Sequence, residues 1–133
     1  MGINADTVRR MISHLESGSG DIFFEHVADN VDWTVEGTHP LAGRYLSKAD
    51  FHVHTFARLN KILPGGTQLC VQGVLTDGDW AVVELRSHAI AKSGMRFDNR
   101  YCWVIRFEDE MIVEVRAYLD SALVQKLIDE NEK

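Results

Sequence analysis

Apolar residues near the start of the chain recur with the spacing of an α-helix. They fall at i, i+3, i+4 and i+7, so they would form one apolar stripe on an amphipathic helix. This pattern predicts a helix over residues 6–16, begun by Asp6 and ended by a Ser-Gly run. A short second helix is expected from Asp21. The stripe of the first helix comprises Val8, Met11, Ile12 and Leu15.

A strand, a loop and a long helix follow. Apolar and polar residues alternate over residues 31–36, which is the period of a half-buried strand. Residues 37–46 are rich in turn-forming residues and predict a loop. A capping sequence at Ser47 opens a helix expected to reach Leu63, where a Pro-Gly-Gly run ends it. Its predicted stripe has His52 in the middle, either as a core histidine or as part of a site. The stripe comprises Ala49, Val53, Phe56, Leu59 and Leu63.

The second half of the chain carries strand patterns separated by short turns. Such turns join antiparallel neighbours, so a four-stranded meander is expected, followed by a closing helix over 120–131. Helices segregated from a meander predict a single α+β domain over residues 1–133. A long antiparallel sheet curls, so the helix over 47–63 would close it into a cone-shaped α+β barrel with a small-molecule site. The predicted strands are 67–76, 80–91, 97–107 and 111–119.

Composition and charge narrow the range of partners. A net charge of −6 opposes binding to nucleic acid, which needs clustered Lys and Arg. No apolar stretch approaches the ~20 residues that cross a membrane, and the start lacks the pattern of a secretory signal, so a cytoplasmic location is expected. Cys70 and Cys102 are far apart and are expected to be reduced. His52 and His54 would point to opposite sides of a helix, so no metal site is predicted.

Several short segments carry a resemblance to a known family. With them the chain resembles the nuclear-transport-factor-2-like superfamily, in its SnoaL-like or ketosteroid-isomerase-like branch, over essentially its whole length. The resemblance implies a cystatin-like cone and a homodimer formed through the outer face of the sheet. The superfamily includes isomerases, dehydratases, cyclases, epoxide hydrolases and binding proteins, so fold alone does not fix the function. The segments are 33–37 (WTVEG), 39–43 (HPLAG), 99–101 (NRY), 112–116 (IVEVR) and 118–120 (YLD).

The hairpin between the predicted strands 80–91 and 97–107 selects candidate site residues. If Ser93 and Gly94 form a two-residue tip, residues whose numbers sum to 187 face each other. Three pairs of polar or aromatic residues would then share one face, which is either a pocket lining or a solvated or interface face. A slip of one residue would move them to the other side. The pairs are His88 with Asn99, Arg86 with Tyr101, and Glu84 with Trp103.

The resemblance favours the pocket interpretation of this face. In relatives similar to limonene-epoxide hydrolase, positions matching Asn99 and Tyr101 line the cavity, and Arg86 and His88 match an arginine and an acid that also face it. Ala117 stands where cyclases and epoxide hydrolases of this type carry a catalytic aspartate, and alanine cannot transfer a proton. Further wall residues are expected at Trp33, Tyr45, His52 and Trp103.

Two accounts of function remain open at this point. In the first, the protein is a cofactor-free isomerase, dehydratase or cyclase acting on a small, largely apolar molecule. His88 or Glu84 would take a proton, Arg86 would orient the base, and Tyr101 and Asn99 would bind a developing oxyanion. In the second, Glu84 and Arg86 form an ion pair and the protein is a non-catalytic binding or sensing dimer. Protein docking is the least favoured use of the fold.

Overall fold

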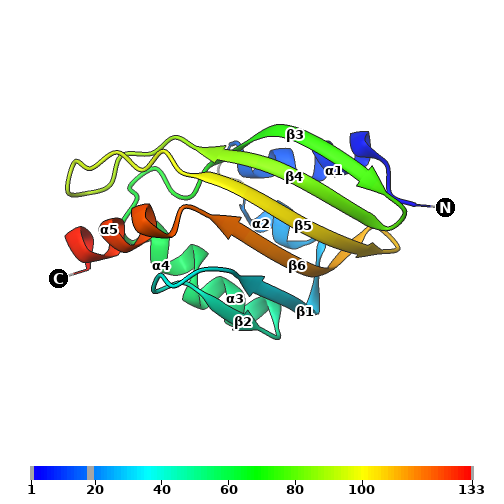
Figure 1. The fold of residues 1–133 in the computed structure, drawn as a ribbon, viewed down its shortest axis with the longest axis horizontal. Helices are drawn as coiled ribbons and strands as arrows, with labels where there is room; N and C mark the ends of the chain where they lie inside the picture. The colour runs from blue at the N-terminus through cyan, green and yellow to red at the C-terminus, as the bar shows by residue number, and fades with distance from the viewer. Residues whose placement is uncertain (1, 18–19, 133) are drawn as a thin grey trace.

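Six strands form one curved sheet that does not close into a barrel (Figure 1). The computed structural model describes residues 2–17 and 20–132. The strand order is β2-β1-β6-β5-β4-β3. Neighbouring strands are antiparallel except β1 and β6, which run parallel. The strands are β1 (Val27–Val35), β2 (Gly43–Tyr45), β3 (Leu69–Asp77), β4 (Trp80–Ser87), β5 (Arg100–Glu108) and β6 (Met111–Leu119).

The helices gather on one side of the sheet and at one of its ends. In Figure 1, α1 to α4 lie behind the sheet and α5 lies beyond the end of β6, so the face toward the viewer carries no helix. This arrangement confirms the α+β class and gives the sheet an inner and an outer face. No described helix is long and apolar enough to cross a membrane. The helices are α1 (Ala5–Ile12), η1 (Ser13–Leu15), α2 (Gly20–Phe24), α3 (Lys48–His54), α4 (Phe56–Asn60) and α5 (Ser121–Asn131).

The first predicted helix is confirmed in its buried stripe and corrected at its start. All four stripe residues are buried, and the last of them belongs to the short 3-10 turn η1. The capping residue is Asn4, whose side chain accepts a hydrogen bond from Thr7 N at 2.8 Å, rather than Asp6. Asn and Asp are equally good caps, so the helix can begin two residues earlier than predicted with the same buried stripe.

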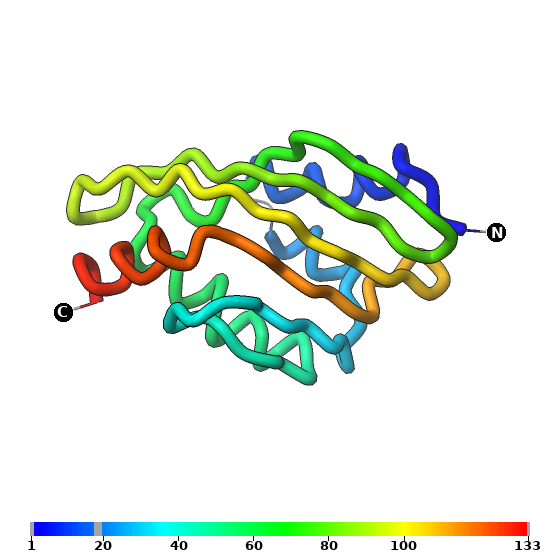
Figure 2. The backbone as a smooth tube through the Cα atoms, in the orientation of Figure 1, coloured from blue at the N-terminus to red at the C-terminus, as the bar shows by residue number. Residues whose placement is uncertain are grey.

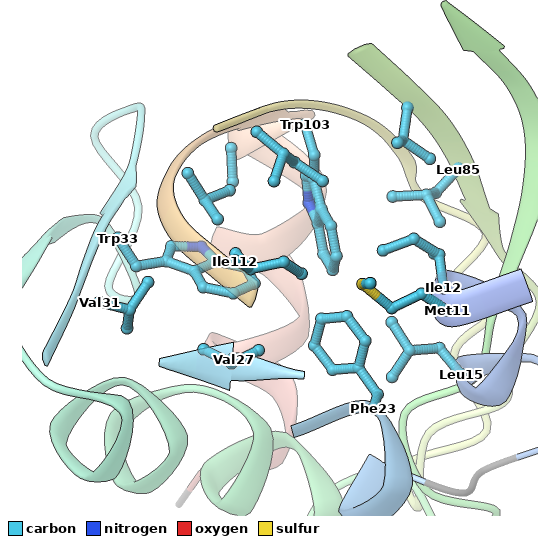
Figure 3. Packing of buried hydrophobic residues seen from close by; sticks show 14 of the residues in the cluster. Met11, Ile12, Leu15, Phe23, Val27, Val31, Trp33, Leu85, Trp103 and Ile112 are labelled. Atoms are coloured by element: carbon cyan, nitrogen blue, oxygen red, sulfur yellow. The ribbon is translucent and has the colours of Figure 1, made fainter. Parts of the chain in front are cut away.

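Aromatic rings fill the space between the helices and the inner face (Figure 3). Trp33 of β1 stacks on Phe51 of α3 with ring centroids 3.9 Å apart, and meets Trp103 of β5 edge-on at 5.2 Å. Phe23 of α2 packs against both tryptophans. Each of these side chains is at most 3% exposed. The rings tie β1, β5 and two helices into one core.

The long helix expected over 47–63 is broken at Thr55. This residue adopts φ −124° and ψ −80°, outside the helical region. Its hydroxyl donates to Phe51 O at 2.6 Å, a side-chain bond of the kind that disturbs a helix. The predicted stripe is also wrong in α3, where Val53 is 61% exposed and Phe51 is buried. The buried face instead follows the helical spacing of Phe51, Thr55, Leu59 and Ile62.

The predicted loop over 37–46 contains a short strand. β2 pairs with the end of β1 and sets Tyr45 opposite Trp33. β1 itself starts at Val27, four residues before the predicted strand. The pairing shortens the irregular part of the loop to residues 36–42.

The β4–β5 register differs from the predicted one by a single residue. Facing residues have numbers that sum to 186, because the turn holds three residues rather than two. Ala91 N donates to Met95 O across the turn at 2.8 Å. Gly94 ends the turn with a left-handed φ of +89°, as three-residue hairpin turns require. With the register shifted by one residue, the two members of each predicted pair lie on opposite faces of the sheet.

The three predicted catalytic residues therefore lie on the outer face. Glu84 and His88 are exposed and Arg86 is half-buried, on the side that carries no helix. The predicted partners lie on the inner face instead, so all three predicted pairs are wrong. In the observed register Asn99, Tyr101 and Trp103 lie opposite Ser87, Leu85 and Val83.

Candidate ligand-binding site

A small cavity lies between the inner face of the sheet and the α3–α4 pair. Its volume is about 50 Å³ and its wall is almost entirely apolar. The sheet contributes Trp33, Tyr101, Trp103 and Ala117, among others. The two helices contribute Phe51, Thr55, Phe56 and Leu59. In the backbone trace of Figure 2 the α3–α4 pair lies behind the sheet.

The polar groups of the lining side chains are all neutral. Among the described residues that line the cavity, none carries a carboxylate, an amine or an imidazole. Burial raises the pKa of the Tyr101 hydroxyl, so it stays protonated and acts only as a neutral hydrogen-bonding group. Trp33 Nε1 is buried without a hydrogen-bond partner in the described part of the protein. A buried donor in this condition carries a free-energy cost of about 1–3 kcal/mol, which an acceptor oxygen of a ligand would relieve.

The structure brings four of the predicted site residues together. Trp33, Tyr101, Trp103 and Ala117 line the cavity, and their part in binding stays a prediction. Tyr45 and His52 do not line it. His52 lies outside the core, edge-on to Phe24 at 5.1 Å.

Asn99 is buried but serves the backbone instead of the cavity. Its Oδ1 accepts hydrogen bonds from Arg100 N at 2.7 Å and Asp120 N at 3.1 Å. Its Nδ2 donates to Asp120 O at 3.4 Å. The side chain thus joins the start of β5 to the junction between β6 and α5. These bonds use the amide oxygen and one of the two N–H groups of Nδ2, and a part of Asn99 in binding an oxyanion stays a prediction.

Three residues from outside the strands and the α3–α4 pair close the cavity. Leu41 comes from the loop after β1, Phe97 from the β4–β5 hairpin and Val124 from α5. Each is buried. Leu41 was not predicted because a loop gives no periodic signal, although a leucine in a predicted loop was an indication of packing. Phe97 lay in a predicted strand, where alternation places it on the same face as Tyr101 and Trp103.

The loop that carries Leu41 is fastened by the histidine beside it. His39 is 4% exposed. Its Nδ1 accepts a hydrogen bond from Leu41 N at 3.2 Å, so Nε2 carries the proton and donates to Glu36 O at 3.1 Å. Burial lowers the pKa of His39, which favours this neutral form. Gly37 makes the turn possible, because its φ is +119° and a Cβ there would collide with Ser121 and His39.

Two other side chains hold the same loop. The Tyr45 hydroxyl donates to Leu41 O at 2.8 Å. Arg58 Nη1 of α4 reaches Pro40 O at 3.4 Å, while the rest of its guanidinium binds both carboxylate oxygens of Glu132 at 2.6 and 2.7 Å. The loop is therefore attached to β2, to α4 and, through Glu132, to the end of α5.

Acidification is expected to weaken the fastening of this loop. The pKa of His39 is lower in the folded protein than its unfolded value of about 6.5. The unfolded chain then binds more protons, so this contribution to stability is complete above about pH 6.5 and is lost as the pH falls from there toward the folded pKa. We expect the Leu41 amide signal to broaden or shift over this range in NMR spectra.

The matched variants are His39→Gln and His54→Gln. The first should reduce the change in unfolding free energy between pH 7.5 and pH 5, and the second, which alters an exposed ring, should not. An equal pH dependence in wild type and His39→Gln would contradict the assignment.

Comparison with known proteins identifies the family. A sequence profile of the SnoaL-like domain matches residues 8–115. The chain belongs to the SnoaL-like domain family. In the described part of this SnoaL-like domain, no three His, Cys, Asp or Glu side chains are placed to hold a metal ion.

Two curated relatives are named as cyclases. The chain is 30% identical over 113 residues to dimerizing cyclase phiC of a fungal species, covering 82% of this chain and 50% of that protein. It is 27% identical over 113 residues to dimerizing cyclase tstC of Talaromyces stipitatus, with the same shares covered. This SnoaL-like domain thus spans about half the length of the curated relatives it matches.

Solved structures confirm the fold. An NTF2-like protein from Burkholderia thailandensis has a TM-score of 0.78 at 22% identity, covering 92% of this chain and 95% of that one. Bal32a, from a soil-derived mobile gene cassette, has a TM-score of 0.78 at 23% identity, covering 92% and 94%. TerC, co-crystallised with polyporic acid, has a TM-score of 0.73 at 17% identity, covering 93% and 96%. At these identities the likeness concerns architecture alone.

Proposed function

We propose that this SnoaL-like domain encloses a small, largely apolar ring compound in the cavity between its helices and its sheet, without a cofactor. The observation that carries the proposal is the wall of the cavity, which is apolar and whose polar groups are neutral. Apolar enclosure with a few hydrogen-bonding groups is typical of small-molecule sites.

The size of the cavity implies that the protein adjusts when a ligand binds. Ligand pockets commonly measure ~300–1,000 Å³, and this cavity measures about 50 Å³. Side chains must therefore move to admit a ring compound.

The reaction best supported is a cyclisation directed by orientation of the substrate. The names of the two curated relatives point to this class. Three features of this wall argue against general acid–base catalysis. Position 117 is an alanine, Tyr101 is neutral, and no described lining residue is charged. Holding reacting groups in a productive geometry is by itself a source of rate enhancement, and Trp33 N–H and Tyr101 O–H are the donors that would bind a substrate oxygen. A binding or sensing protein without turnover is the second candidate, favoured by the same lack of an acid or base.

Filling the cavity tests the proposal. Ala117→Leu should weaken binding of toluene or indole by about tenfold or more, because extra methylenes in a packed space cost about 1–3 kcal/mol. NMR shifts of the Trp103 indole N–H would report binding. The controls are Glu84→Gln and His88→Ala on the outer face, which should bind both probes as the wild type does. Equal binding by Ala117→Leu, or loss of binding in the outer-face variants, would contradict the proposal.

A homodimer formed through the outer face is part of the same proposal. Leu75 is 72% exposed and Tyr118 is 45% exposed there, and half-buried Val82 and Val104 lie on the same face. No helix covers this surface (Figure 1), so a second copy would remove it from water. Light scattering on the intact protein would give a monomer mass if the proposal is wrong.

A further inference from the structure

We propose that the cavity is reached from the helix side, through a vestibule between α2 and α4, and that its occupant is a ring compound whose hydroxyl group stays in that vestibule. This inference rests on the proposed function, since it names the path and the substrate class of the same site. The vestibule is a hollow of about 140 Å³ whose wall includes Asp21, Phe24, His52, Phe56, Asn60 and Thr67.

Only two lining residues separate the vestibule from the cavity. Phe56 and Thr67 belong to the walls of both hollows. A rotation of these two side chains would join the spaces into one channel that runs from the surface to the Trp103 ring. The combined space would hold a larger molecule than the cavity alone.

The partition formed by these two residues is held by few bonds. Asn60 Oδ1 accepts from both Thr67 N at 3.1 Å and Thr67 Oγ1 at 3.0 Å, and Asn60 itself is exposed. Phe56 follows directly after the helix break at Thr55 and meets Phe24 edge-on at 5.1 Å. Phe56 also contacts Phe51, with ring centroids 5.9 Å apart. One exposed amide and two ring contacts thus keep the partition closed.

The alternative path, under the Leu41 loop, is more firmly closed. That loop is fastened by His39, by Tyr45 and by Arg58, three side chains from different parts of the fold. Opening it requires several hydrogen bonds to break together, two of which involve buried groups. Opening the vestibule therefore breaks fewer contacts than opening the Leu41 loop.

The chemistry of the vestibule complements a hydroxyl group. Its wall carries a carboxylate, on Asp21, and an imidazole, on His52. Neither side chain has a hydrogen-bond partner in the described part of the chain. The carboxylate accepts a hydrogen bond and the imidazole can donate one, so a phenol or cyclic alcohol could use both. With the ring in the apolar cavity, the hydroxyl would then remain at the polar end of the channel.

Obstructing the vestibule tests the path. A Cβ added at Gly20 meets no atom of the described residues within 4 Å, and the same is true of Gly65, which lies outside both hollows. Gly20→Phe should slow exchange of p-cresol, measured by NMR line shape, by about tenfold, as expected for an added barrier of about 1.4 kcal/mol. Gly65→Phe should leave the rate unchanged. Asn60→Ala should accelerate exchange, because it frees Thr67.

A second comparison tests the hydroxyl. Wild type should bind p-cresol about threefold to tenfold more tightly than toluene, the range expected for one hydrogen bond. The double variant Asp21→Asn, His52→Phe should lose most of this preference. Circular dichroism and the unfolding midpoint would show that each variant is folded.

The outcomes separate this inference from the proposed function. If the wild type binds both probes but Gly20→Phe exchanges them at the wild-type rate, the vestibule path is wrong and the cavity assignment stands. If p-cresol has no advantage over toluene, the hydroxyl assignment is wrong. If neither probe binds the wild type, the proposed function itself fails.

Discussion

Replacing Trp103 with alanine is expected to lower the free energy of unfolding by about 3–5 kcal/mol, the usual cost of removing a large buried aromatic side chain. Trp103 is 3% exposed and contacts both Trp33 and Phe23. These contacts lie at the centre of the core (Figure 3), so the surrounding helices cannot collapse into the space without moving β1. Urea or thermal unfolding followed by circular dichroism measures the loss.

The matched control is Trp80→Ala. Trp80 is half-buried on the outer face, where the Arg116 guanidinium lies 5.0 Å from its ring centroid. Its removal should cost about 1 kcal/mol, the scale of a partly exposed cation–π pair. Equal losses for the two tryptophans would mean that the assignment of inner and outer faces is wrong.

Asn99→Leu is expected to lower the free energy of unfolding by about 2–3 kcal/mol, since a buried N–H that loses its acceptor costs about 1–3 kcal/mol. The substitution leaves Arg100 N and Asp120 N without the oxygen that accepts from both. Asn99→Asp keeps this oxygen and should lower the free energy of unfolding by a smaller amount. Thermal unfolding of the variants measures both effects.

The neighbouring Asp98→Ala provides the control. Asp98 is exposed and forms its ion pair with an exposed arginine, Arg96, so stability should hardly change, as is usual for surface pairs. The alternative role for Asn99, binding a substrate oxyanion, makes the opposite prediction. It would leave stability unchanged in Asn99→Leu and abolish binding of the probe.

Period and turn signals were sufficient to predict the fold class and most of the elements. The helical stripe that ends at Leu15 and the alternation of the last four strands survive almost unchanged in the structure. They do so because burial on one side of an amphipathic segment is a local property of the sequence. The helix caps at Ser47 and Asp120 are also properties of the local sequence. The Ser47 side chain accepts a hydrogen bond from Asp50 N at 3.1 Å.

The faces of the β4–β5 hairpin were wrongly predicted because the number of residues in the turn was assumed. A Ser-Gly pair is compatible with a two-residue turn and with the end of a three-residue turn, and the two differ by one step of register. The strands themselves held the better signal. Ala81, Val83 and Leu85 form an entirely apolar face, and the opposite face carries Glu84 and Arg86. This alternation places the two charged residues outward whatever the turn.

Tertiary packing decided the remaining features. The helix break at Thr55 depends on a side-chain bond to Phe51 O that no helical period reveals. Likewise the parallel pairing of β1 with β6 sets Trp33 beside Val115 and Val35 beside Ala117, across about eighty residues of chain. The cavity lies where these non-local contacts meet, so only part of its wall could be predicted.

The attachment of Glu132 to Arg58, and of Arg58 to Pro40 O, has a practical consequence for fused or labelled forms of the protein. A label attached close to Glu132 would lie beside the loop that covers the cavity. A label attached close to Ile3 would lie at the opposite end of the sheet from α5 (Figure 1), because Ile3 N donates to Gly78 O, in the turn between β3 and β4, at 2.9 Å. A fluorophore near the carboxyl end should therefore sense movements of the Leu41 loop, and one near the amino end should be insensitive to them.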